Sequence, residues 1–205
     1  MGSEPGYRVR DAGPGDAAAI AAIWAPIIRD TVITFHPDPR SPGEVAAMIA
    51  ARRADGRAFL VAEGGEGVLG FASYAQFRPG PGYARTMEHT VNIAAPARGR
   101  GVGAALVAAL VAHAAAAGHR SLIGAITAEN PGSLAFHRRM GFAEVGRLPE
   151  AGWKFGRFHD LVLMRRGLGP ERPGDEGGDG RGTGAGGGDV DPARDSPGDS
   201  AAATR

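Results

Sequence analysis

The sequence has no cysteine and very little lysine. Without cysteine, the 205-residue chain can form no disulfide, no thiolate nucleophile and no Cys-ligated zinc site. Lysine occurs once, at Lys154, against 22 arginines, so the presence of an arginine is by itself weak evidence of a function. Because a cysteine-free chain is compatible with a reducing compartment, we expect a cytoplasmic protein.

Long hydrophobic runs are also missing. The most apolar stretch, 104–117, is interrupted by His113 and is shorter than the roughly 20 residues of a membrane-spanning helix. Residues 1–10 contain no apolar segment typical of a secretory signal. With a net charge of only +1, the composition gives no reason to expect nucleic acid or an anionic membrane as a partner.

The composition changes near residue 168. From Gly169 to the end there is no aromatic residue, leucine, isoleucine or methionine, and Gly, Pro, Asp, Ala and Ser dominate. Such a segment buries too little apolar surface to offset the entropy lost on ordering. We therefore predict one folded domain over 1–168 and a disordered acidic tail over 169–205.

Within the folded part, the hydrophobic pattern alternates between the periods of strands and helices. A run of strands followed by strand–helix units indicates an α/β fold with a mixed, mostly antiparallel sheet flanked by helices. The predicted strands are 7–12, 58–63, 68–77, 88–94, 122–127, 142–148 and 158–165, and the predicted helices are 17–29, 43–54, 102–117 and 131–140.

Capping residues support the helix boundaries. Asp16 precedes the first helix and is its expected N-cap, and Ser41 with Glu44 predicts a capping box at the second. Gly118 is expected to end the long third helix in the left-handed conformation.

A glycine-rich segment, Arg98-Gly99-Arg100-Gly101-Val102-Gly103, opens the third helix. Glycines let several N–H groups point at one ligand, and a helix N-terminus adds partial positive charge, which suits a diphosphate. A tight turn without a ligand explains the glycines equally well. A nicotinamide dinucleotide site is a third possibility, with Glu129 as its acidic residue, although the glycine spacing departs from that fingerprint.

The surrounding residues narrow the choice. Arg98-x-x-Gly101-x-Gly103, followed by Asn130, Ser133, His137 and Gly141-Phe142, resembles the two signatures of the GNAT acyl-CoA transferase superfamily. Within this superfamily, the chain resembles the branch of phosphinothricin and methionine sulfone or sulfoximine acetyltransferases. Three segments carry this closer resemblance: Glu88-His89-Thr90-Val91, Leu134-x-x-His137 and Gly152-x-Lys154-Phe155-Gly156-Arg157-x-x-Asp160. This resemblance runs from about residue 7 to residue 168.

The resemblance implies a fold, a cosubstrate and its site. In this superfamily the fourth strand splays away from the fifth, and the pantetheine arm of acetyl-CoA pairs with its exposed backbone. Asn92 departs from the aromatic residue expected in this branch, which does not affect backbone pairing. The residues implied to bind acetyl-CoA are Val91, Asn92, Ile93, Arg98, Gly99, Arg100, Gly101, Val102, Gly103, Ala104, Asn130 and Ser133.

The resemblance also implies the catalytic groups. N-acetylation needs a base, because a free amine is mostly ammonium at neutral pH. Glu88, at the start of the fourth strand, is the candidate base and is expected to act through water. His137 stands where many members carry a tyrosine general acid, and its titration range suits proton donation to the leaving thiolate.

The acceptor side is implied less directly. Arg78 matches the family's substrate-side arginine, which suits a substrate carboxylate. The residues expected to contact a small amine acceptor are Arg78, Pro79, Gly80, Glu88, His89, Thr90, Phe35 and Tyr83. Lys154 and Asp160 are interpreted as structural or dimer-forming, and this branch commonly forms homodimers. His36 has no partner at metal-ligand spacing, so we expect no metal site.

We therefore predict an acetyl-CoA-dependent N-acetyltransferase that acts on a small amino-acid-like amine. Two alternatives keep the same fold. One is acetylation of a peptide or protein amine, which requires an open groove in place of a small pocket. The other is a non-catalytic acyl-CoA sensor, which would need neither Glu88 nor His137.

Overall fold

A computed structural model describes residues 6–169, and in them the elements follow the order that the sequence predicts. Apart from Gly169, the predicted tail lies outside the described residues, so its disorder stays a prediction. The elements are β1 (Tyr7–Asp11), α1 (Ala17–Asp30), α2 (Pro42–Ala54), β2 (Phe59–Gly64), β3 (Gly67–Gln76), β4 (Thr86–Ile93), α3 (Val102–Ala116), β5 (Ser121–Thr127), α4 (Pro131–Arg139), β6 (Ala143–Lys154) and β7 (Arg157–Gly167).

The strands form one sheet in the order β1-β2-β3-β4-β5-β7-β6. Only the pairing of β4 with β5 is parallel among the strand pairs of residues 6–169. The expected mixed, mostly antiparallel sheet is thereby confirmed.

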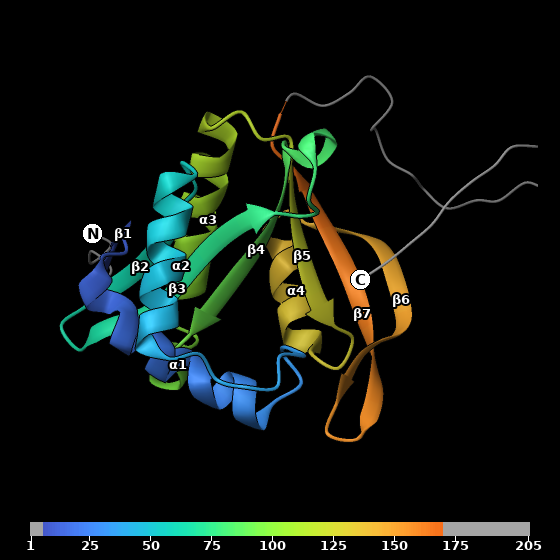
Figure 1. Cartoon of the computed structure of the whole chain (residues 1–205), viewed down its shortest axis with the longest axis horizontal. Helices are drawn as coiled ribbons and strands as arrows, with labels where there is room; N and C mark the ends of the chain where they lie inside the picture. The colour runs from blue at the N-terminus through green and yellow to red at the C-terminus, as the bar shows by residue number, and fades with distance from the viewer. Residues whose placement is uncertain (1–5, 170–205) are drawn as a thin grey trace, which may run out of the picture. The chain divides into compact units, whose positions relative to one another are not determined.

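The two central strands separate along their length. β4 pairs with β5 only from Thr86 to Glu88, opposite Ser121 to Ile123, although β4 continues to Ile93. Figure 1 shows the pair diverging toward the arrowheads of both strands. The main chain of β4 beyond Glu88 therefore faces a gap on the β5 side, and the splayed fourth strand expected from the sequence is present.

Helices cover both faces of the sheet. On one face, α1 and α2 pack on β2 and β3 through a cluster that includes Ile20, Val45 and Phe71. On the other face, Leu106 and Leu110 of α3 are fully buried against Leu122 and Met164. Each fully buried side chain of this size contributes about 1.5–3 kcal/mol. Figure 1 shows α1 and α2 over the β1–β4 half of the sheet, with the β6–β7 hairpin at the opposite edge.

The start of α2 has the cap that the sequence predicts, and the start of α1 does not. The Ser41–Glu44 capping box is formed, since the Ser41 hydroxyl accepts from the Glu44 N–H and the Glu44 carboxylate accepts from the Ser41 N–H. Asp16 occupies the N-cap position of α1, but the prediction that its side chain caps this helix is wrong. Its carboxylate instead accepts from the Gly13 N–H and pairs with Arg10 at 2.7 Å.

The last two strands are longer than predicted. β6 continues to Lys154, beyond the expected end at Leu148, because a register shift between Leu148 and Gly152 absorbs the irregular residues there. Glu150 adopts a φ of 53°, and its N–H donates to the Asp160 carboxylate. This gives Asp160 a structural contact.

Candidate active site

Alternation along β4 divides its side chains between the two faces of the sheet. Met87, Val91 and Ile93 pack on the α3 side. Glu88 and Thr90 face the opposite side, where they line a small cavity with Trp24 and Phe71. One strand therefore supplies residues to the site from both faces, at the point where it leaves β5.

A groove of about 700 Å³ runs from the gap between β4 and β5 to the start of α3. Gly99 and Gly101 adopt φ values of 75° and 82°, which an L side chain rarely tolerates, so the turn into α3 depends on glycine. The first N–H groups of α3 have no intrahelical partner and belong to residues that line this groove. It is lined, among others, by Val91, Asn92, Ile93, Arg98, Gly99, Gly101, Val102, Gly103, Ala104, Asn130 and Ser133.

Gly103 lies beside Phe136 and Ile93 in the groove. A Cβ added there would lie 3.5 Å from the ring of Phe136 on α4 and 3.7 Å from Ile93, which are ordinary van der Waals distances. The start of α3 therefore lies close to both α4 and the end of β4. Asn130 holds the start of α4, because its Oδ1 accepts from the Ser133 N–H at 3.0 Å.

The two arginines of the glycine loop have different surroundings. The Nε of Arg98 donates to the Ile93 carbonyl at 3.4 Å, which places this side chain at the groove. Arg100 is exposed and pairs with Glu66 at 3.4 Å, and it is the one residue of 98–104 that is absent from the groove lining.

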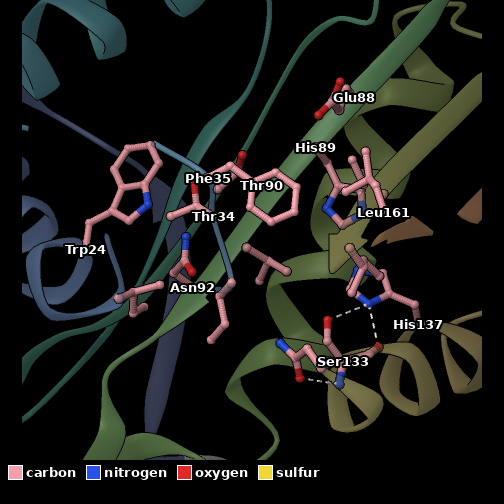
Figure 2. A pocket seen from close by; sticks show the side chains of 17 residues that line it. Trp24, Thr34, Phe35, Glu88, His89, Thr90, Asn92, Ser133, His137 and Leu161 are labelled. Atoms are coloured by element: carbon pink, nitrogen blue, oxygen red, sulfur yellow. Dashed lines mark hydrogen bonds between the residues drawn. The ribbon is translucent and has the colours of Figure 1, made fainter. Parts of the chain in front are cut away.

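A second cavity, of about 320 Å³, continues from this groove through the gap between β4 and β5. Glu88, His89 and Thr90 of β4 line it together with Asn130, Ser133 and His137. We call it the central cleft. Figure 2 shows Trp24 on one side of the cleft and His89 and His137 on the other. Residues that lie far apart in the sequence, including both candidate catalytic groups, meet here.

The hydrogen bonds of His137 indicate its tautomer. Its Nδ1 lies 2.7 Å from the Ser133 carbonyl oxygen, which can only accept, so Nδ1 carries the hydrogen. Figure 2 shows this contact and the second one, at 3.3 Å, to the Ser133 hydroxyl. In the neutral ring, Nε2 then presents a lone pair, and this atom is buried without a partner among the described residues. Burial lowers the pKa of His137, which favours the neutral form.

His89 lies against His137. The ring centroids are 5.1 Å apart, and both ring nitrogens of His89 are buried without a partner in the part of the chain that the structure describes. Burial, and secondarily the neighbouring His137, lowers the pKa of His89 to about 3, so it is neutral at pH 7. Gly124 on β5 leaves the space in front of the pair, since a Cβ there would be 3.1 Å from His89 Nε2.

Glu88 is half-buried, and burial raises the pKa of its carboxyl group above the ordinary value. A carboxylate that binds protons more tightly is a stronger base toward an ammonium group. Glu88 lies where β4 separates from β5, and this position suits proton removal from an acceptor bound in the central cleft.

The predicted acceptor residues are only partly brought together. Phe35 lines the central cleft, as do His89 and Thr90. The segment from Arg78 to Tyr83 lines neither the groove nor the central cleft. There the Arg78 guanidinium lies 5.3 Å from the Phe77 ring, and Gln76 donates to the Arg78 and Gly80 carbonyls at 2.7 Å. The roles of Arg78, Pro79, Gly80 and Tyr83 stay predictions.

Sequence reasoning missed several residues of the central cleft, among them Trp24, Gly124 and Leu161. Trp24 and Leu161 line it from α1 and β7, and Gly124 opens it on β5. Trp24 lies within the predicted helix 17–29, and its neighbours across the cleft come from strands much later in the chain. Glycine in the interior of a buried strand is a signal of close approach that was available for Gly124.

Residues 6–169 contain no group of three or more His, Cys, Asp or Glu side chains placed to hold a metal ion. None of the helices described is long and apolar enough to cross a membrane. Glu129, required by the dinucleotide hypothesis, is engaged by Arg157 at 2.6 Å and by His159 at 2.6 Å.

The profile of the acetyltransferase (GNAT) family matches residues 25–142, a span that contains β4, the glycine loop and α4. The chain belongs to this family of N-acetyltransferases. It is 38% identical over 165 residues to the L-methionine sulfoximine/L-methionine sulfone acetyltransferase of Pseudomonas paraeruginosa, covering 80% of this chain and 96% of that protein.

Two solved structures add information about this GNAT chain. A phosphinothricin acetyltransferase from Sinorhizobium meliloti in complex with acetyl-CoA is 33% identical, with a TM-score of 0.76 over 80% of this chain and 89% of the other. A ribosomal-protein-alanine N-acetyltransferase from Brucella melitensis is 36% identical, with a TM-score of 0.76 over 78% and 99%. Enzymes of this family use acetyl-CoA, and the fold expected from the sequence is confirmed.

Proposed function

We propose that this acetyltransferase transfers an acetyl group from acetyl-CoA to the amino group of a small amino-acid-like acceptor, such as methionine sulfone, methionine sulfoximine or phosphinothricin. One observation carries the proposal. Glu88 and the unpartnered Nε2 of His137 line the same cleft, at the point where β4 leaves β5 and the larger groove begins. The names of the relatives support the choice of acceptors.

The groove fits acetyl-CoA in this proposal. For the pantetheine arm of an acyl-CoA, Val91 to Ile93 offer main chain that β5 leaves unpaired. For the diphosphate, residues 99–104 offer N–H groups at a helix start, and Arg98 adds positive charge. Asn130 and Ser133 line the junction between the groove and the cleft. When bound, acetyl-CoA supplies the acetyl thioester that is attacked.

The proton transfers are assigned to two side chains. Glu88, with its raised pKa, takes a proton from the acceptor's ammonium group through a water molecule. Neutral His137 holds a lone pair at Nε2, so it can take the second proton from the amine nitrogen and pass it to the departing sulfur. This refines the prediction of a general acid, because His137 must receive a proton in the cleft before it donates one.

The size of the central cleft supports a small acceptor. About 320 Å³ lies at the lower end of the range for ligand pockets, and apolar walls from Trp24, Phe35 and Leu161 face its polar groups. An amino acid with a short polar head at the end of its side chain suits these dimensions. Arg78 stays the predicted partner of its carboxylate.

A second candidate acceptor is the N-terminal amine of a protein. The likeness to a ribosomal-protein-alanine N-acetyltransferase favours it. The sensor hypothesis has less support, because a protein that only binds acyl-CoA needs neither the half-buried Glu88 nor the His137 Nε2, which has no partner among the described residues.

We also propose a cytoplasmic homodimer. Its support is an apolar surface on the β6–β7 hairpin, where Trp153 and Phe158 are more than half exposed and their rings lie 4.7 Å apart. The other exposed large apolar residues of this hairpin are Val145, Leu148 and Phe155. Exposed apolar clusters of this kind are typical of interfaces. Light scattering measures the mass in solution that decides this point.

The function is tested by thiol release from acetyl-CoA with methionine sulfone, methionine sulfoximine, phosphinothricin, the common amino acids and an alanine-starting peptide. We expect turnover with at least one small amino acid, and a kcat about 10²–10⁴-fold lower in Glu88→Gln. Calorimetry should show unchanged binding of CoA by this variant. Turnover with the peptide alone would support the second candidate, and binding without any turnover would support the sensor.

A further inference from the structure

The wall of the central cleft that contains Phe35 belongs to a segment without regular structure. Residues 31–41 connect α1 to α2 and contain neither helix nor strand. The Phe35 ring nevertheless lines the cleft. A loop of this kind holds a side chain in one place only if other parts of the molecule fix it.

Lys154 fixes the loop from the end of β6. Its ammonium group donates to the carbonyls of Ile28, in the last turn of α1, and of Thr34, the residue before Phe35. The ammonium also lies 5.2 Å from the centre of the Phe155 ring. Lys154 is 6% exposed, and burial lowers its pKa. The carbonyls of a helix C-terminus carry partial negative charge, which compensates a buried cation.

His159 supports the Phe35 ring from β7. The two rings are stacked, with centroids 5.8 Å apart and planes 21° from parallel. His159 Nδ1 lies 2.6 Å from the Glu129 carboxylate, and Nε2 lies 3.0 Å from the Lys154 carbonyl. Both partners are acceptors, so the two contacts are hydrogen bonds only if the ring carries a hydrogen on each nitrogen. Buried and doubly held in this way, the ring cannot rotate.

Gly152 completes the contact. A Cβ on this residue would overlap the Phe35 ring, so only glycine lets β6 approach the loop this closely. The Phe35 ring is therefore held by its neighbour Thr34, by the His159 ring and by the backbone at Gly152. All three restraints come from, or end on, the β6–β7 hairpin, which is more than 100 residues away in sequence.

From this arrangement we infer that Lys154 and His159 are positioning residues that set acceptor selectivity by fixing the Phe35 wall of the central cleft. The inference rests on the proposed function for the identity of the acceptor. Neither residue lines the cleft, and both act through Phe35. Of the 31–41 loop only Ile33 lines the acyl-CoA groove, and Phe35, Lys154 and His159 do not. Loss of Lys154 or His159 should therefore change acceptor use while leaving acetyl-CoA binding intact.

The kinetic test compares Lys154→Met, which removes both hydrogen bonds, with Lys154→Arg, which keeps the charge, and with the exposed control Arg147→Met on the same hairpin. For Lys154→Met we expect the acceptor KM to rise about tenfold, equivalent to about 1.4 kcal/mol of binding. The KM for acetyl-CoA should change less than twofold. Lys154→Arg should recover part of the loss, and Arg147→Met should behave as wild type.

A double mutant shows whether the effect passes through Phe35. Phe35→Ala alone should raise the acceptor KM and reduce the preference for long side chains over alanine. Adding Lys154→Met to Phe35→Ala should then change little further, because coupled residues are not additive. Equal rises of both KM values in Lys154→Met, or additive effects in the double mutant, would overturn the inference.

A test of His159 that needs no turnover separates this inference from the proposed function. NMR should show that His159→Gln shifts the ring resonances of a labelled Phe35 while CoA binding persists. An unmoved Phe35 ring would contradict the inference whatever the acceptor. If no acceptor turns over but this shift appears, the proposed function fails and the positioning of Phe35 stands.

Discussion

The two sides of the site are built in different ways. The acyl-CoA groove includes one continuous stretch, 98–104, whose glycines and helix start offer main-chain N–H groups. The acceptor side is formed by side chains from α1, the 31–41 loop and β7, which are held together by Lys154 and His159. A donor site made of backbone N–H groups depends on the backbone conformation of its loop. An acceptor site made of distant side chains can change its selectivity without disturbing the donor.

The largest effect that tests this division is expected at His137, where the two sides meet. Replacing His137 with Gln removes the lone pair at Nε2 that we assign to proton transfer, and general acid–base groups contribute about 10²–10⁴-fold. We expect kcat to fall by about 10²-fold, with both KM values within a few fold of wild type, measured by thiol release.

Ser133→Ala is the matched control for His137→Gln. Of the contacts to His137, it removes the 3.3 Å side-chain contact and leaves the Ser133 carbonyl that sets the tautomer. Near-normal kcat at saturating acetyl-CoA is expected, and saturation is needed because Ser133 also lines the groove. If His137→Gln retained full kcat, the histidine would have only a packing role beside His89 and Phe142, whose rings lie about 5 Å away.

The same division explains which features the sequence could predict. The glycine loop and the Ser41–Glu44 box depend on residues within a few positions of each other, and both are present as expected. Asp16 also had a local signal, but Arg10 from β1 competes for its carboxylate. The contact of Lys154 with Thr34 spans 120 residues, and no local pattern encodes it.

Elements were therefore predicted better than the contacts between them. The extension of β6 past Leu148 depends on its pairing with β7, because Gly152 and Pro149 weaken its strand pattern. The cleft residues from β4 and α4 were found because their motifs resemble those of the family. Trp24 and Leu161 carry no such motif, and only the packing of α1 and β7 brings them to the cleft.

Two glycines allow the donor and acceptor sides to be disturbed separately. Gly101→Ala places a Cβ at a φ of 82° and 3.3 Å from the Tyr7 hydroxyl, and a left-handed L residue costs about 1–2 kcal/mol. Gly152→Ala places a Cβ on the Phe35 ring. We expect Gly101→Ala to raise the KM for acetyl-CoA about tenfold, and Gly152→Ala to raise the acceptor KM by a similar factor.

Initial-rate kinetics with each substrate varied in turn separates these two effects. Gly56→Ala is the control, since Gly56 also has a positive φ of 65° but lies outside both cavities. It should lower the melting temperature without changing either KM. The comparison breaks down if Gly101→Ala and Gly152→Ala raise the same KM, because one connected site would then bind both substrates.

The smallest effect concerns the pH dependence of Glu88. Its pKa is raised by burial, so the folded state binds this proton more tightly than the unfolded chain does. The folded state consequently loses stability as the pH rises from the ordinary glutamate pKa through the raised one. Glu88→Gln lacks this titration, so it should melt at a higher temperature than wild type at neutral pH.

The same titration should appear in the kinetics of the wild type. Because the base must be deprotonated, kcat/KM should increase with pH through the raised pKa of Glu88, and Glu88→Gln should lack this rise in its residual activity. Thermal melts between pH 4 and 8 provide the check on stability, and the difference in melting temperature should shrink below the ordinary glutamate pKa. A melting-temperature difference that stays constant at every pH would show that burial of the charged Glu88 carboxylate does not cause the difference. The rise of kcat/KM with pH would then belong to another group in the cleft.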